Sequence, residues 1–324
     1  MASGGPEAAV IRQILGAIPK EWRGTTFRNC NLLGRDGFAT KLNALLDGGG
    51  SIGAAEMDGL GVAEDYLRVA SNFSTTFEAL LARRANSPVR QYVTFASAAM
   101  PVVAVVLTAG GKTVHLSLGG APNPLNATAL DAIALLGGRL ECHAGGPPPS
   151  AATDSIVLSL SEADPAAAGA VPAPAGAHGV IHRNLLVITD AGKISPAEIE
   201  IVRKRMGIPL TVPMAESALW RLAGDQVRGA EPTPPSDAEQ AWLGAHLQAL
   251  SGTEVAPESP PVLYTAGLPA LASLWLALGT RGGADILMCS TAYGGSSQLT
   301  DLLTSRTSKL NKHTFDIQAI PCDH

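Results

Sequence analysis

Residues 262–297 read VLYTAGLPALASLWLALGTRGGADILMCSTAYGGSS, and their pattern of apolar and small residues indicates the fold class. Residues 262–265 predict a strand, a glycine turn at Gly267 leads into an apolar helix, and residues 285–289 predict another strand. Strand, turn, helix and strand in this order are typical of parallel α/β units. We therefore expect an α/β protein with a mostly parallel sheet.

The alternation of strands and helices extends upstream of this stretch. Residues 92–95 and 113–118 predict strands, and residues 127–136 predict a helix that ends at a Gly-Gly pair. Residues 100–108 are apolar and suit either a helix or a strand. Further helices are expected at residues 8–18, after Asp36, and at residues 75–84, 196–206 and 238–250.

A linker is expected in the middle of the chain. Residues 144–179 are rich in Gly, Pro, Ala and Ser and contain one apolar strand, at residues 155–160. They separate residues 1–143, a helix-rich and then α/β region, from residues 180–324, a second α/β region.

Two stretches, residues 92–136 and 264–303, share a rough plan. Each has a small-residue turn, an apolar segment, a Gly-Gly pair, a strand, a second Gly-Gly pair and a helix. Duplication of a half-domain explains this plan, and so does the ordinary alternation of an α/β protein.

Composition narrows the classes of partner. The 324 residues are 46% hydrophobic, which is enough for a sizeable core, and the net charge of −5 lacks the basic excess that nucleic-acid binding needs. The most apolar stretch, residues 266–279, is shorter than the roughly 20 residues that cross a bilayer, and we expect Pro269 to interrupt it. Residues 1–18 do not resemble a secretory signal, so we expect a cytoplasmic protein without a nucleic-acid or membrane partner.

The glycine turn is a candidate anion site. A turn between a strand and a helix presents free N–H groups at the helix N-terminus, where peptide dipoles stabilise an anion, and Ala266, Gly267 and Leu268 occupy this position. Tyr293 follows the next expected strand and precedes two glycines, so its ring is available to a planar cofactor at the edge of the sheet.

These residues resemble a known family. Residues 265–271, Thr-Ala-Gly-Leu-Pro-Ala-Leu, are similar to the Ser-Gly-Met-Ala-Ala segment of the pyridoxal-phosphate (PLP) enzymes of cysteine and methionine metabolism, which include cystathionine γ-synthase and γ-lyase. Residues 292–296, Ala-Tyr-Gly-Gly-Ser, are similar to their Tyr-Gly-Gly-Thr segment. The resemblance covers residues 236–318 and implies part of an aspartate-aminotransferase-type (PLP fold type I) large domain, with residues 92–136 as a possible diverged duplicate.

The resemblance also implies roles for individual residues. It places the cofactor phosphate on the backbone amides of Ala266, Gly267 and Leu268, and the pyridine ring on Tyr293. Tyr66 and Arg68 resemble the family's Tyr-x-Arg segment, whose side chains reach the phosphate of a neighbouring subunit. These six positions are the expected pyridoxal 5′-phosphate site.

The expected function is that of a divergent or truncated PLP enzyme of sulfur amino-acid metabolism, acting by C–S elimination or γ-replacement on an amino-acid substrate. The family's Schiff-base lysine follows the glycine turn by well over a hundred residues, whereas 57 residues follow Gly267, and no lysine stands in the expected order. The catalytic residues are therefore unassigned. The alternative is a non-catalytic pseudoenzyme or assembly partner, and the family implies a homo-oligomer in either case.

No metal site is expected. The four cysteines are scattered without a Cys-x-x-Cys pair, and His178 and His182 lack a third ligand nearby. Arg203, Lys204 and Arg205 lie near the end of an expected helix, where the helix dipole accounts for their positive charge.

Overall fold

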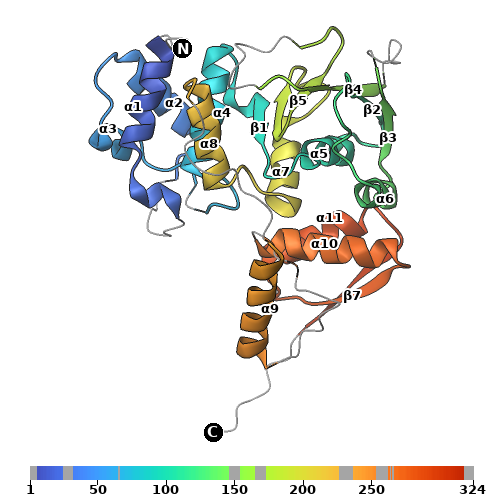
Figure 1. Ribbon diagram of the computed structural model, residues 1–324. Coiled ribbons are helices and arrows are strands. Elements are labelled where there is room, and N and C mark those ends of the chain that lie inside the picture. The colour runs from blue at the N-terminus through green and yellow to red at the C-terminus, as the bar shows by residue number, and fades with distance from the viewer. Residues whose placement is uncertain are drawn as a thin grey trace.

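The computed structural model describes residues 6–24, 32–64, 66–145, 154–164, 173–225, 236–252, 262, 264 and 266–316. This part of the chain is an α/β protein with a mixed six-stranded sheet and helices on both sides of it (Figure 1). The expected α/β class is confirmed. None of the helices in the described ranges has the length and apolar content to cross a membrane.

Five of the six strands in the main sheet point in the same direction. The sheet has the order β1-β6-β5-β4-β2-β3; β6 is antiparallel to both of its neighbours, and the other pairings are parallel. The register places His115 of β2 opposite Glu141 of β3 and Val157 of β4. The strands are β1 (Tyr92–Thr94), β2 (Thr113–Ser117), β3 (Arg139–His143), β4 (Ser155–Ser161), β5 (Gly179–His182) and β6 (Leu185–Ile188).

Three helices cover one face of this sheet: α5 (Met100–Thr108), α6 (Ala127–Leu135) and α7 (Pro196–Met206) (Figure 1). Alternate strand residues such as Val114 and Leu116 point toward them and are fully buried. Helix α7 begins where the sequence predicts, because Ser195 accepts a hydrogen bond from the Glu198 N–H at 3.4 Å and proline follows at the first helical position.

A second hydrophobic core brings helices near the N-terminus together with a helix that follows the main sheet in the chain. Helices α1 (Pro6–Ala17), α2 (Gly34–Asp47), α3 (Ala54–Gly59) and α4 (Asn72–Arg84) pack with α8 (Val212–Leu222), and Figure 1 shows α1 and α8 side by side. Trp22, in a short 3-10 helix (Lys20–Arg23), meets the Phe38 ring edge-on at 5.7 Å between centroids. Both cores combine residues that precede and follow the expected linker, and β4, from inside that linker, lies in the middle of the sheet. The rest of its Pro- and Ala-rich sequence lies largely outside the described residues.

The C-terminal unit has a small sheet of its own. It comprises α9 (Asp237–Ser251), α10 (Gly267–Thr280), β7 (Ala284–Cys289), α11 (Gly294–Thr304) and β8 (Leu310–Phe315), with β7 and β8 parallel. Helix α10 packs against α6 and α7 (Figure 1). The run α10-β7-α11-β8 repeats the order of α5-β2-α6-β3, as duplication and ordinary α/β alternation both predict.

Two expectations for this unit differ from the structure. Val262 and Tyr264 lie in no strand, and the other two residues of the expected strand 262–265 are outside the described ranges. Pro269 does not interrupt α10, because it lies in the first turn, where no intrahelical N–H bond is lost. Helix α10 is also buried along one stripe only: Leu268 and Ala272 are buried, but Leu274 is 50% exposed.

Candidate functional site

The structure brings the two glycine motifs of the C-terminal unit together. Ala266 is the N-cap of α10 and Tyr293 is the N-cap of α11. A Cβ atom built on Gly295 would lie 3.2 Å from Leu268 Cδ1 and 2.5 Å from Tyr293 Cε1, so the two helix starts meet at this glycine. A Cβ atom built on Gly267 would have no atom within 4 Å, so the space beside its backbone is open.

Tyr66 and Arg68 precede α4 and contact each other, and Arg68 also contacts α7. The Arg68 guanidinium lies 4.6 Å from the centroid of the Tyr66 ring, within the range of a cation–π interaction. Arg68 also donates a hydrogen bond to the backbone carbonyl of Lys204 in α7. Arg68 is thus attached to α7 by a side chain that is only 7% exposed.

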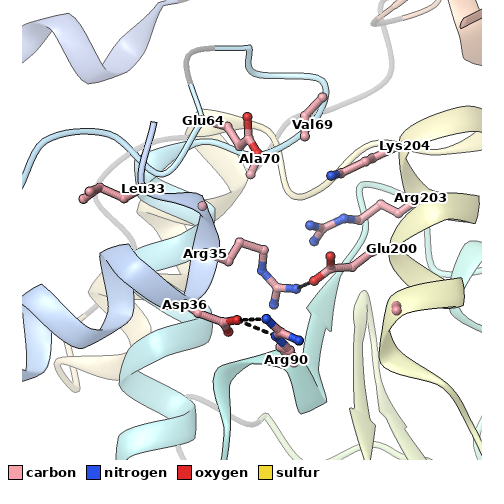
Figure 2. A pocket seen from close by; sticks show the side chains of 12 residues that line it. Leu33, Arg35, Asp36, Glu64, Val69, Ala70, Arg90, Glu200, Arg203 and Lys204 are labelled. Carbon is pink, nitrogen blue, oxygen red and sulfur yellow. Dashed lines mark hydrogen bonds and ion pairs between the residues drawn. The ribbon is translucent and has the colours of Figure 1, made fainter. Parts of the chain in front are cut away.

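Two buried charged side chains, Arg35 and Arg203, line a cavity of about 360 Å³, which we call the arginine cavity (Figure 2). Its wall is formed by the start of α2, the segment between α3 and α4, Arg90, and one face of α7. The charged side chains that line it are Arg35, Arg90, Arg203, Lys204, Asp36, Glu64 and Glu200.

Helical periodicity carries Arg203 into the interior. Ile199, Val202, Arg203 and Met206 are the buried residues of α7, and their spacing of i, i+3, i+4 and i+7 is that of one helix face. Arg203 occupies a position of this stripe that an apolar side chain would normally fill. It is therefore 1% exposed, although it is charged.

Glu78 compensates the charge of Arg203. Its side chain on α4 is fully buried, and Glu78 Oε1 accepts hydrogen bonds from Arg203 Nη1 at 3.0 Å and from the Thr94 hydroxyl at 2.7 Å. The Thr94 N–H donates to the same oxygen at 2.9 Å. Since buried charges are stable only when paired and hydrogen-bonded, the two hydrogen bonds from Thr94 help to compensate the burial of the Glu78 carboxylate.

Arg35 shares this carboxylate with Arg203. Arg35 Nη2 lies 2.8 Å from Glu78 Oε2, and Nη1 forms a second ion pair with Glu200. Burial alone would lower the pKa of Arg35, but Glu78 and Glu200 outweigh it and raise this pKa above its ordinary value. Arg203 differs, because burial dominates and lowers its pKa. Arg203 is the less compensated of the two cations.

Two nitrogens of the Arg203 guanidinium also have no hydrogen-bond acceptor among the described residues. Its Nη1 donates to Glu78 and, at 3.3 Å, to the Thr94 carbonyl, whereas Nε and Nη2 are buried without a hydrogen-bond partner among the described residues. A buried donor left unsatisfied costs about 1–3 kcal/mol. Figure 2 shows the Arg203 guanidinium and the Lys204 ammonium group directed the same way in the cavity. An oxygen anion placed there would accept these hydrogen bonds and neutralise charge.

A second cavity, of about 300 Å³, lies where ligands commonly bind in α/β proteins. Ala96, His182 and Asp164 line it at the carboxyl ends of β1, β5 and β4. Its charges are more nearly satisfied, because Arg221 Nε lies 3.2 Å from Asp164 Oδ2. Burial lowers the pKa of His182, so this histidine adds no positive charge near neutral pH. The arginine cavity is therefore the better anion site.

The structure contradicts the expectation that the helix dipole accounts for the charge of Arg203. A basic residue near a helix C-terminus is ordinary at the surface, whereas Arg203 points inward. One signal was present in the sequence: Arg203 falls in the apolar stripe of residues 199, 202 and 206. No local pattern identifies Glu78 or Arg35 as its neighbours.

Comparison of the chain with protein-family models, with curated proteins and with solved structures finds no match in any of the three.

Proposed function

We propose that this chain binds a small anionic molecule, a carboxylate or a phosphate, in the arginine cavity. The observation that carries the proposal is Arg203, a buried guanidinium in the cavity wall whose Nε and Nη2 have no hydrogen-bond partner among the described residues. A planar guanidinium offers a fork of N–H groups that matches the oxygens of a carboxylate or a phosphate. Lys204 adds a second cation at the same wall.

The size of the cavity suits a metabolite. Its volume of about 360 Å³ falls near the lower end of the range of about 300–1,000 Å³ that is common for small-molecule sites. Glu64 and Glu200 also line it, so a ligand that carries an amino group beside its anionic group would find partners for both. An amino acid or a phosphorylated amine has this chemistry.

Titration calorimetry with inorganic phosphate and with succinate tests this proposal. We expect saturable binding of at least one anion. Arg203→Lys should weaken it at least about tenfold, because an ammonium group replaces the guanidinium fork with a point charge. Arg205→Lys is the matched control, since Arg205 lies on the same helix but its side chain bonds to Gln298 of α11. Equal affinity in all three proteins would reject the cavity as the site.

A second candidate function, cofactor binding, is supported by the meeting of the helix starts at Gly295. There Leu268 and Tyr293 approach each other, the N-terminal amides of α10 adjoin open space at Gly267, and the Tyr293 side chain is 63% exposed. These residues suit the phosphate and the ring of pyridoxal phosphate: the α10 amides would hold the phosphate, and Tyr293 would stack on the pyridine ring. When bound, this cofactor supplies an electron sink for reactions of amino acids.

Covalent attachment of this cofactor would need a lysine near these residues. Lys312 of β8 reaches the first turns of α11, where Nζ donates hydrogen bonds to Ser297 Oγ and Asp301 Oδ1 at 2.8 Å each. With these two partners, Nζ is engaged in a hydrogen bond and an ion pair rather than available as a nucleophile. We therefore propose reversible, non-covalent binding. Pyridoxal phosphate should bind saturably, Tyr293→Ala should weaken it, and borohydride should leave no stoichiometric adduct on Lys312.

A further inference from the structure

Two histidines and a glutamate meet at the edge of the six-stranded sheet. His115 lies on β2, and Glu141 and His143 lie on the neighbouring edge strand β3. Side chains alternate between the faces of a sheet, and Val114 and Leu116 point toward α5 and α6, so His115 points to the opposite face. The parallel register puts Glu141 directly beside His115, and His143 follows two residues later on the same face.

The three side chains converge on one point. His115 Nδ1 lies 3.2 Å from His143 Nε2 and 3.3 Å from Glu141 Oε2, and the three potential ligand atoms all lie within 4.8 Å of one another. His115 Nδ1 thus has two polar neighbours at similar distances. A proton on Nδ1 can point at only one of them, whereas a cation between the three groups would use a lone pair of each.

These distances agree with tetrahedral coordination. Zn²⁺ binds histidine nitrogen at about 2.0–2.1 Å, which separates neighbouring tetrahedral ligands by about 3.3 Å. Both contacts of His115 Nδ1 fall close to this separation. The remaining span, from Glu141 to His143, can shorten without disturbing the strands, because the Glu141 side chain is 60% exposed.

We propose that His115, Glu141 and His143 bind a divalent transition-metal ion of the Zn²⁺ type, with water as the fourth ligand. Two imidazole nitrogens and one carboxylate oxygen suit Zn²⁺, Co²⁺ or Ni²⁺ better than Ca²⁺ or Mg²⁺, which prefer oxygen ligands. Adjacent, hydrogen-bonded strands hold the ligands, so little ordering is needed when the metal binds. Cys142 lies on the other face of β3 and is not part of the set.

Binding of Co²⁺, a spectroscopic probe of zinc sites, tests the proposal. We expect one Co²⁺ per chain, visible bands typical of tetrahedral coordination, and no thiolate charge-transfer band, because Cys142 is excluded. Excess Zn²⁺ should displace the Co²⁺. His143→Ala and Glu141→Gln should each weaken binding at least about tenfold, since changes to residues that merely support metal ligands already cost 10–100-fold.

His313→Ala is the matched control. His313 Nε2 lies 3.2 Å from Asp285 Oδ1 on the small sheet, so it forms a similar histidine–carboxylate pair but belongs to no group of three metal-ligating side chains in the described residues. This variant should keep the affinity and the spectrum of the unmodified protein. Absence of bound Co²⁺, or binding that survives both β3 substitutions, would overturn the proposal and leave His115 and His143 as a hydrogen-bonded pair. A thiolate charge-transfer band would also overturn it in favour of a cysteine site.

Discussion

Arg203 Nη1 lies 3.0 Å from Glu78 Oε1, and each side chain is 1% exposed, although 125 residues separate the two in the chain. This contact joins α7 to α4. Because Glu78 also accepts a hydrogen bond from the Thr94 N–H, the pair is linked to β1 at the edge of the main sheet. The same helix position that brings Arg203 to Glu78 also makes Arg203 part of the wall of the arginine cavity.

Loss of the Glu78 charge should destabilise the fold strongly. Glu78→Gln leaves Arg203 buried without its counter-ion, which typically costs about 3–5 kcal/mol. The double variant Glu78→Gln, Arg203→Met should recover part of the loss, because Arg203 is then no longer a buried cation without a counter-ion, while Arg35 keeps its ion pair with Glu200. Urea unfolding of the unmodified protein and of these two variants measures both effects. Glu216→Gln, which breaks an exposed ion pair with Arg23, is the control and should cost about 0–1 kcal/mol.

Gly295 should control the position of Tyr293. A Cβ atom at Gly295 would overlap the Tyr293 ring at 2.5 Å, but Tyr293 is 63% exposed and can move aside. We expect Gly295→Ala to lower the free energy of unfolding by about 1–3 kcal/mol. It should also weaken pyridoxal-phosphate binding, as Tyr293→Ala does. Gly294→Ala should do neither, because a Cβ atom there has nothing within 4 Å. Thermal melting and cofactor titration separate the two effects; unchanged cofactor affinity in Gly295→Ala would contradict the stacking role.

The serine caps should each contribute measurably to stability. Ser236 and Glu239 form a capping box: the Ser236 N–H donates to Glu239 Oε2 at 2.8 Å, and Ser236 Oγ accepts the Glu239 N–H at 3.3 Å. Ser195 caps α7 with one such bond. Each serine-to-alanine change should cost on the order of 1 kcal/mol in the free energy of unfolding. A loss below the error of chemical unfolding at Ser195 would show that α7 is held by packing alone.

Acid should destabilise the protein through His178. Burial lowers its pKa, and the neutral ring accepts a hydrogen bond from the Val157 N–H at 2.9 Å. The unfolded chain therefore binds a proton more readily than the folded protein. The contribution to stability is complete above the ordinary histidine pKa of about 6.5 and is lost as pH falls from there through the folded-state pKa.

His178→Asn offers a way to measure this contribution. Its amide oxygen can accept the Val157 N–H but does not titrate over this range. Unfolding free energies measured between about pH 7.5 and pH 5 should fall less steeply for this variant than for the unmodified protein. Since burial also lowers the pKa of His182, some dependence on pH should persist. Identical slopes for the two proteins would contradict the role of His178.

Local signals predicted much of the secondary structure. The Ser195 and Ser236 caps mark the starts of α7 and α9, and apolar runs mark β2, β4 and β7. These features depend on hydrogen bonds and periodicity within a few residues, which are readable in one sequence. The strand expected at residues 262–265 has the right composition, but a strand also needs a partner, and composition does not provide one.

The candidate sites depend on contacts between distant residues. Arg35 and Glu200 are 165 residues apart, and His115 and His143 are 28 apart on adjacent strands. Their meeting follows from strand order and helix packing, which residue spacing does not encode. Helix starts are therefore predictable from the sequence, because one motif is sufficient, whereas both clusters of charged or metal-ligating side chains are not.

The side-chain N–H resonances of arginine provide the most direct test of the anion site. In a nitrogen-15-labelled protein, the Nε–H signal that disappears in Arg203→Lys identifies Arg203. Titration with inorganic phosphate and, separately, with succinate should shift this signal saturably for at least one anion, with the dissociation constant found by calorimetry, while the Arg205 signal stays in place. An Arg203 signal that does not respond to an anion that binds, or the binding of neither anion, would show that this buried guanidinium does not hold the ligand.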